Sequence, residues 1–132
     1  MIEFTKTEED FLQFMEEARI ATSHDNIPHV KPVSFIYHTK NIFIATDYKT
    51  RTLKNLKINP KVSVTIDIYQ SGKHKAVCIQ GKAKVLENGQ EFQEIYKIFE
   101  KKFAWVRNEP WKENEAPFIK IIATNKTSWG IT

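Results

Sequence analysis

The residues best suited to bind a charged ligand lie in one short basic run of this sequence. The segment from Lys49 to Lys61 contains five cations and no acid, which exceeds the net charge of +4 of the whole chain. Thr50 is a good N-cap for a helix over this run, and Asn59-Pro60 ends it. Because the first turn of a helix presents unpaired amides and the positive end of its dipole, it favours a phosphate. A solvated basic helix face is the simpler alternative. The phosphate hypothesis assigns Lys49, Thr50, Arg51 and Thr52 as ligands.

A second candidate is the apolar segment His29–Phe35, which carries Pro32 in its middle. Proline cannot donate to a β ladder, so this stretch is expected to be a sheet edge or a local break in pairing. Backbone groups left free there could meet the donors and acceptors of a planar heterocycle. A simple bulge has the same sequence signature and, taken alone, is the favoured interpretation.

No other group of residues indicates catalysis or metal binding. The four histidines, His24, His29, His38 and His74, lack the spacing of metal ligands. The sequence contains neither a glycine-rich dinucleotide fingerprint nor a nucleophile elbow. Cys78 is the single cysteine and is expected to be a packed thiol. The sequence therefore predicts no metal site and assigns no catalytic residue.

Length and composition predict one cytoplasmic domain. A chain of 132 residues is close to the length of a single domain. One cysteine cannot form a disulfide framework, which fits a reducing compartment. The acidic start MIEFTKTEED is not a signal peptide, and no apolar run approaches the roughly 18 residues of a membrane span. We expect a single domain over residues 1–132 that does not associate with a membrane.

Strand patterns dominate the elements that must position the basic run. Residues 61–69 alternate between apolar and polar types, and residues 77–85 supply a matching strand of a long hairpin. Further strands are expected at RIATSH, HVKPVSFIYH and NIFIAT, with two short final strands at PFIKIIAT and KTSWGI. Helices are expected after a capping box at Thr7, over the basic run, and from Glu91 to Phe103. Six or seven strands joined by short turns favour a mainly β fold, a small antiparallel barrel with short flanking helices.

Two of the expected strands have apolar residues on both faces. In SFIY and NIFIA, one face can point into the barrel, but the other must lie against a helix, a ligand or a second subunit. We infer a homodimer that packs on these strand faces. Cover by the chain's own helices is the alternative.

The order of these segments resembles a known family. The blocks HVKPVSFIYH, NIFIATDYKTRTLKNLKINPKVSVTIDIY and KAVCIQGKAKVLE keep the order and spacing found in the flavin-binding split-barrel family related to pyridoxamine 5'-phosphate oxidase. The resemblance is strong over residues 17–88 and weaker at KTSWGI. It implies a split β-barrel and a homodimer that binds two FMN molecules at the subunit interface.

The resemblance also implies which residues contact FMN. One strand lies along the isoalloxazine ring, two residues lie beside the ribityl chain, and the start of the basic helix binds the phosphate. Trp129 falls in the final shared block and is a candidate to stack on the ring or cover it. The implied contacts are Val30, Lys31, Pro32, Val33 and Ser34 for the ring, Ala45 and Thr46 for the ribityl chain, and Lys49, Thr50, Arg51 and Thr52 for the phosphate.

Three departures from the family narrow the expected function. Family members often have Ser-Arg-Lys where this chain has Thr50-Arg51-Thr52, so Lys49 or Lys54 must substitute for the missing cation. Ala76 stands near the place of a flavin-contacting glutamine. The oxidase's C-terminal extension, with its Arg and His, has no counterpart before Thr132, so vitamin B6 oxidation is not expected.

We therefore expect an FMN-binding flavoprotein that transfers hydride to or from an unidentified small molecule. The residues from Trp105 to Pro117 are expected to form the rim that selects the substrate. One alternative is a reductase of the same fold that uses a deazaflavin, and some relatives bind haem. A small basic barrel that binds single-stranded nucleic acid explains the charge but not the order of the blocks. A non-catalytic dimer that has lost its ligand is a further alternative.

Overall fold

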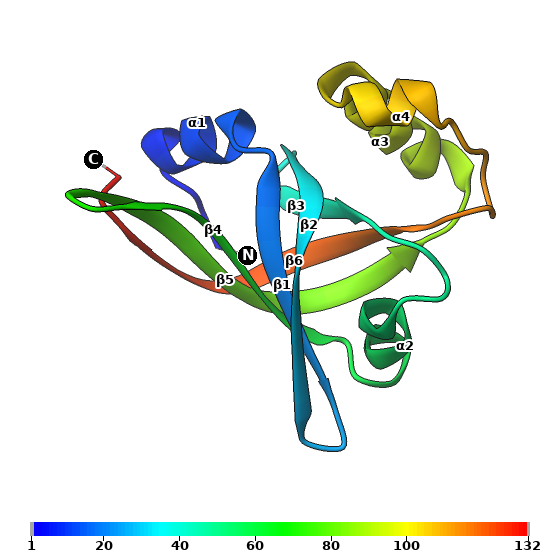
Figure 1. Ribbon diagram of the computed structural model, residues 1–132, viewed down its shortest axis with the longest axis horizontal. Helices are drawn as coiled ribbons and strands as arrows, with labels where there is room; N and C mark the ends of the chain where they lie inside the picture. Colours follow the sequence, from blue (N-terminus) through cyan, green and yellow to red (C-terminus); the bar gives the residue numbers. More distant parts are fainter. Residues whose placement is uncertain (1, 132) are drawn as a thin grey trace.

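The alternating strands close into an antiparallel barrel. In the computed structural model, which describes residues 2–131, the strands neighbour one another in the order β1-β2-β3-β6-β5-β4 around the barrel (Figure 1). The mainly β prediction is confirmed, with six strands. They are β1 (Glu17–His24), β2 (Ile27–His38), β3 (Asn41–Ala45), β4 (Lys61–Gln70), β5 (Lys73–Leu86) and β6 (Phe118–Trp129).

Four helices flank the barrel. The predicted helices are present, and a short additional one directly follows the third. No helix among residues 2–131 is long and apolar enough to cross a membrane. The helices are α1 (Lys6–Phe14), α2 (Arg51–Ile58), α3 (Gly89–Lys102) and α4 (Ala104–Asn108).

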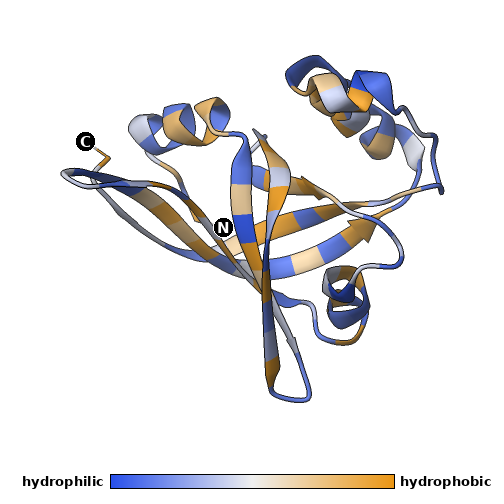
Figure 2. Cartoon of the chain, viewed as in Figure 1, coloured by the Kyte–Doolittle hydropathy of each residue, from blue (hydrophilic) through white to orange (hydrophobic). Residues whose placement is uncertain are grey.

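Every second residue along the strands is apolar and points into the barrel interior. Ile20, Val64 and Ile79 are each at most 1% exposed and belong to a single core cluster. Figure 2 shows apolar and polar residues alternating along the barrel strands. This is the pattern that a half-buried strand requires, because successive side chains point to opposite faces.

A second apolar cluster lies outside the barrel and corrects one sequence inference. Ile36 and Phe43 are cross-strand partners on β2 and β3. Their outer faces pack against Phe92 and Phe99 of α3, and all four are at most 2% exposed. The chain's own helix therefore covers these strands, as the alternative interpretation proposed. The apolar strand faces give no reason for a second subunit.

The end of the chain forms one strand rather than the two short ones expected. β6 pairs with β5 over its whole length, and the register shifts once, at Gln80 and Gly81. Thr124 is the extra residue of this bulge, and its hydroxyl donates to the Gln80 carbonyl at 3.2 Å. A Cβ at Gly81 would lie 2.3 Å from the Ile122 carbonyl oxygen, so glycine is required where the two backbones approach.

β2 changes partner halfway along. Residues 27–34 pair with β1 alone, and residues 35–38 pair with β3. The hairpin of β1 and β2 extends beyond the barrel (Figure 1). Its register is continuous through the Arg19–Pro32 pair, so Pro32 marks a sheet edge, one of the two structures expected for it, and not a bulge.

α1 is fastened to the far end of β6 by a buried carboxylate. The capping box uses Thr5 and Glu8, not Thr7 as the sequence pattern indicated. Glu8 is 4% exposed and accepts hydrogen bonds from Lys126 and from Ser128. Burial alone would raise the pKa of Glu8. These hydrogen bonds outweigh burial and lower the pKa to about 2.

Replacement of Glu8 by glutamine should destabilise the protein in a pH-dependent way. Because the pKa falls from 4.5 to about 2 on folding, the ionised Glu8 stabilises the fold above about pH 4.5. That stabilisation is lost as the pH falls towards 2. Urea denaturation should show that Glu8→Gln lowers the unfolding free energy by about 3 kcal/mol at pH 7, and by little near pH 2.

The exposed pair of Glu3 and Lys40 supplies the control. Glu3→Gln should leave the unfolding free energy nearly unchanged at every pH, because water and salt screen an exposed ion pair. Equal pH dependence in the parent and in Glu8→Gln would contradict the assignment of Glu8.

Candidate functional site

The start of α2 is built as the basic run predicts. Thr50 is the N-cap, and its hydroxyl oxygen accepts from the Leu53 amide at 3.2 Å. The same hydroxyl donates to the Asp47 carbonyl at 3.0 Å and lies 3.0 Å from the Thr46 hydroxyl. Two threonines from the end of β3 and the start of α2 are thereby held together.

Two amides of the first turn of α2 have no partner within residues 2–131. The Leu53 amide is capped by Thr50, and the Lys54 amide donates to the Thr50 carbonyl. No acceptor within that range binds the amides of Arg51 and Thr52. Free amides at a helix N-terminus are the groups that bind a phosphate or carboxylate.

The cations around this turn are available to a ligand. Lys49, Arg51 and Lys54 are exposed, and among residues 2–131 none of the three lies within 4.0 Å of a carboxylate oxygen. Asp47 is near, but its carboxylate accepts from the Lys49 amide at 3.0 Å. The turn therefore combines free amides with unpaired positive charge.

A cavity of about 340 Å³ lies beside this turn and collects four of the predicted residues, Lys31, Ala45, Thr46 and Thr50. Lys31 comes from the stretch of β2 that pairs with β1, and it supplies a cation to the lining of this cavity. Because Lys31 is half-buried, it is better shielded from water than the exposed cations of α2.

The segment after α3 closes the other side of this cavity. Trp105, Glu109, Trp111 and Ala116 line it, where the sequence predicts a rim from residues 105–117. The rings of Trp105 and Trp111 are stacked, with centroids 5.9 Å apart and planes 7° apart. The Trp111 indole N–H donates to the Ala116 carbonyl at 3.1 Å. Sequence patterns gave no sign of α4, which carries Trp105.

The remaining predicted contacts lie elsewhere. Val30 and Trp129 line a second cavity of about 340 Å³, on the outer side of the sheet. Thr52 is 1% exposed, and its hydroxyl has no partner within residues 2–131. Pro32 is exposed, Val33 packs against the barrel core, and Ser34 is half-buried. Of the predicted phosphate and ribityl contacts, Ala45, Thr46 and Thr50 line the cavity beside α2, whereas Lys49, Arg51 and Thr52 do not.

The histidines do not form a metal centre within residues 2–131. No group of three metal-ligating side chains occurs there. His38 Nε2 lies 2.9 Å from Glu94 Oε1, and the ring of His74 stacks on that of Tyr69 with centroids 4.0 Å apart. None of the four histidines lines the cavity beside α2.

Comparison with known proteins gives a family and a fold. Residues 4–125 match the family model for pyridoxamine 5'-phosphate oxidase. No curated protein matches the sequence.

Three solved structures illustrate the shared fold. The haem storage protein HutZ of Vibrio cholerae is 15% identical, with a TM-score of 0.82 over 93% of this chain and 92% of that one. An FAD-binding protein of Mesorhizobium loti is 20% identical, with a TM-score of 0.73 over 90% and 88%. An FAD-binding protein of Mycobacterium smegmatis is 19% identical, with a TM-score of 0.73 over 95% and 94%. At such low identity the likeness concerns the fold alone.

Loss of the Thr50 hydroxyl should loosen the start of α2. Thr50→Val removes the N-cap acceptor and the contact with Thr46 at nearly constant volume, so the unfolding free energy should fall by about 1–2 kcal/mol. Thr50→Ser keeps the cap and should stay within about 0.5 kcal/mol of the parent. Chemical denaturation measures both, and equal stability of the Val and Ser variants would exclude Thr50 as the cap.

Proposed function

Because this chain belongs to the pyridoxamine 5'-phosphate oxidase family, we propose that it binds a flavin mononucleotide and acts as a flavin-dependent oxidoreductase on a small molecule. The observation that carries this proposal is the cavity beside α2. It is lined by Thr46, by Thr50 at the start of α2 and by the half-buried Lys31, with the acids Asp47 and Glu109 also in the lining, and the two free amides belong to the residues that follow Thr50.

The phosphate end of FMN fits the residues of α2. The free amides of Arg51 and Thr52 would bind phosphate oxygens, and the side chains of Arg51 and Lys49 would supply charge. Lys31 lines the cavity and can supply the positive charge that is missing at Thr52. This substitution is preferable to one by Lys54, since Lys31 lines the cavity and Lys54 does not.

The flavin ring fits the free edge of β2. The stretch from Ile27 to Ser34 pairs with β1 along one edge. Among residues 2–131, no strand pairs with its other edge. Alternate backbone groups point to each edge of a strand. Because Pro32 has no N–H and pairs with Arg19, the N–H and carbonyl of Val30, two residues away, point to the free edge. A donor and an acceptor there match the imide-like edge of an isoalloxazine.

A bound flavin would supply the hydride-transfer chemistry, and the chain's residues would bind it, orient it and exclude water. Lys31 and the first turn of α2 would hold the phosphate. The stacked Trp105 and Trp111 would restrict which molecules approach the cavity. No acid or base from the chain is assigned to the transfer.

The residues of this site fit the alternative flavin cofactors better than they fit haem. FAD and a deazaflavin share the phosphate and ring chemistry of FMN, so a spectrum and a titration must distinguish them. Haem is less well matched, because none of the four histidines lines this cavity, and an iron ligand would have to come from elsewhere.

We also propose a homodimer, on grounds other than the strand faces covered by α3. Ala21, Ser63, Thr65 and Ala76 are small, uncharged residues on the outer side of β1, β4 and β5, which we call the small-residue face; the ion pair of Arg19 and Asp67, 2.5 Å apart, lines the same cavity. Large apolar side chains stand exposed around it: Val30 at 64%, Tyr69 at 73% and Trp129 at 47%. Such a rim favours association with a second copy. A partner could also bring its Trp129 to the first chain's flavin.

Charge reversal at Arg51 should abolish tight flavin binding. FMN titration, followed by quenching of flavin fluorescence, should show affinity for the parent and a loss of about 100-fold for Arg51→Glu, because a cation beside the phosphate becomes an anion. Lys84→Glu makes the same charge change on β5, away from the cavity, and is the control. Parallel titrations with FAD and a deazaflavin identify the preferred cofactor.

Three results would contradict this proposal. Absence of binding to all three cofactors would favour a dimer without a ligand. Equal affinity in Arg51→Glu and the parent would remove Arg51 from the phosphate site. Salt-sensitive binding of single-stranded oligonucleotides without flavin binding would favour a nucleic-acid function.

An arginine in the small-residue face should separate the subunits. Thr65→Arg places a charge at the centre of the proposed interface, so sedimentation should show a monomer where the parent is a dimer. Thr7→Arg, on the exposed side of α1, should remain dimeric. A dimeric Thr65→Arg variant with an intact circular dichroism spectrum would exclude this face as the interface.

A further inference from the structure

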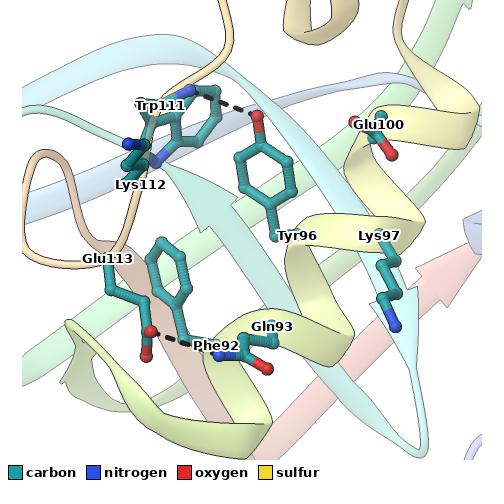
Figure 3. Close-up of a pocket in the computed structure, with 8 residues that line it drawn as sticks. All are labelled: Phe92, Gln93, Tyr96, Lys97, Glu100, Trp111, Lys112 and Glu113. Carbon is teal, nitrogen blue, oxygen red and sulfur yellow. Dashed lines mark hydrogen bonds between the residues drawn. The ribbon is translucent and has the colours of Figure 1, made fainter.

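A larger cavity, of about 580 Å³, lies along α3 and takes no part in the proposed flavin site. One wall is formed by the stretch of α3 from Phe92 to Glu100. The other is formed by the segment from Trp111 to Glu113 that follows α4 (Figure 3). Its volume falls within the range of small-molecule sites.

The two walls are held together by hydrogen bonds. Glu113 accepts from the Gly89 amide at the start of α3 and from the Gln93 side chain at 3.2 Å. The Trp111 amide donates to the Tyr96 hydroxyl oxygen at 3.2 Å. Because Asn88, the N-cap of α3, makes no side-chain cap bond, Glu113 caps this helix from a distant segment. The cavity is therefore formed before any ligand arrives.

The floor of this cavity is aromatic. The rings of Tyr96 and Trp111 meet edge to face, with centroids 4.9 Å apart and planes at 75°. Phe92 lies beside Tyr96, with centroids 6.2 Å apart, and Figure 3 shows the three rings grouped together. A flat aromatic ligand can stack on these rings or meet their edges.

The polar groups left free around this floor favour an anion. The Tyr96 hydroxyl accepts from Trp111, and within residues 2–131 its own proton has no acceptor. Lys97 and Lys112 are exposed, and in the same range neither lies within 4.0 Å of a carboxylate. The Glu113 carboxylate is already engaged by two donors, so Glu100 is the one acid of the lining without a hydrogen bond in that range. The lining has no net charge, because Lys97 and Lys112 are matched by Glu100 and Glu113, but two ammonium groups and the Tyr96 hydroxyl are free to donate, and only one carboxylate of the described chain's lining, that of Glu100, is free to accept.

We propose that this cavity binds a planar aromatic carboxylate that carries a single negative charge. Its ring would stack on one of the Tyr96 and Trp111 rings and meet the other edge to face. Its carboxylate would accept a hydrogen bond from the Tyr96 hydroxyl and pair with the ammonium group of Lys97 or Lys112. The site is independent of the flavin proposal, although Trp111 lines both cavities.

Calorimetric titration with 2-naphthoate tests this site, with the neutral 2-naphthamide as the matched ligand. We expect one naphthoate site per chain, with at least tenfold weaker binding of the amide at low ionic strength, and a smaller difference in high salt. Lys97→Gln and Lys112→Gln should each weaken naphthoate binding about fivefold and leave amide binding unchanged. Lys101→Gln, an exposed cation of α3 outside the cavity, should have no effect.

Three outcomes would overturn the proposal. Equal affinity for naphthoate and naphthamide would show that the negative charge of the ligand does not contribute to binding. Unchanged naphthoate affinity in both lysine variants would place the ligand elsewhere, and because both side chains are exposed, loss of folding would not obscure the result. Displacement of naphthoate by saturating FMN, with no effect of either variant, would place naphthoate in the cavity beside α2.

Discussion

The change of partner along β2 is the constraint on which the barrel and the proposed flavin site both depend. Residues 35–38 pair with β3 and close the barrel, whereas residues 27–34 pair only with β1 and extend beyond it. Where the strand leaves β3, it exposes an edge directly beside the cavity that holds Thr46 and Thr50. Had β2 paired with β3 throughout, this edge would be covered.

Charge is distributed in accordance with this arrangement. Several cations remote from α2 are paired: Lys40 with Glu3, Lys120 with Glu91 and Lys126 with Glu8. These pairs fasten helices and termini to the barrel. The cations of the basic run have no such partners within residues 2–131, so the charges of Lys49 and Arg51 remain available to a ligand at the start of α2. The charge of the buried Glu8, in contrast, is satisfied inside the protein, because its hydrogen-bond partners lower its pKa to about 2 and keep the carboxylate ionised.

Local patterns predicted most elements and the core of the site, and they failed where distant contacts decide the structure. Thr50 was identifiable as an N-cap because the cap, the basic run and Asn59-Pro60 are close in sequence. Cover of Ile36 and Phe43 by α3 could not be predicted, since those residues lie about 50 positions from the helix that buries them. α4 is too short to show a helical period. Thr5 was passed over for Thr7 because each stands three residues before an acidic residue, Glu8 and Asp10 respectively. The polar residues near Thr124 suggested a break in the last strand, where a single bulge suffices.

That bulge reverses which face of β6 each later side chain occupies. Before Thr124, the odd-numbered Ile119, Ile121 and Ala123 lie in the barrel core. After it, Lys126 and Ser128 share a face with the core residues Val77 and Ile79 across the strand pair and reach Glu8, while Trp129 points outward beside Val30. Because of this one extra residue, odd-numbered side chains of β6 face the core before Thr124 and even-numbered ones face it afterwards. Deletion of Thr124 itself would remove the bulge and leave Lys126 and Ser128 opposite Ile79 and Val77, whereas deletion of one residue between Lys126 and Ser128 would turn the indole of Trp129 towards the core.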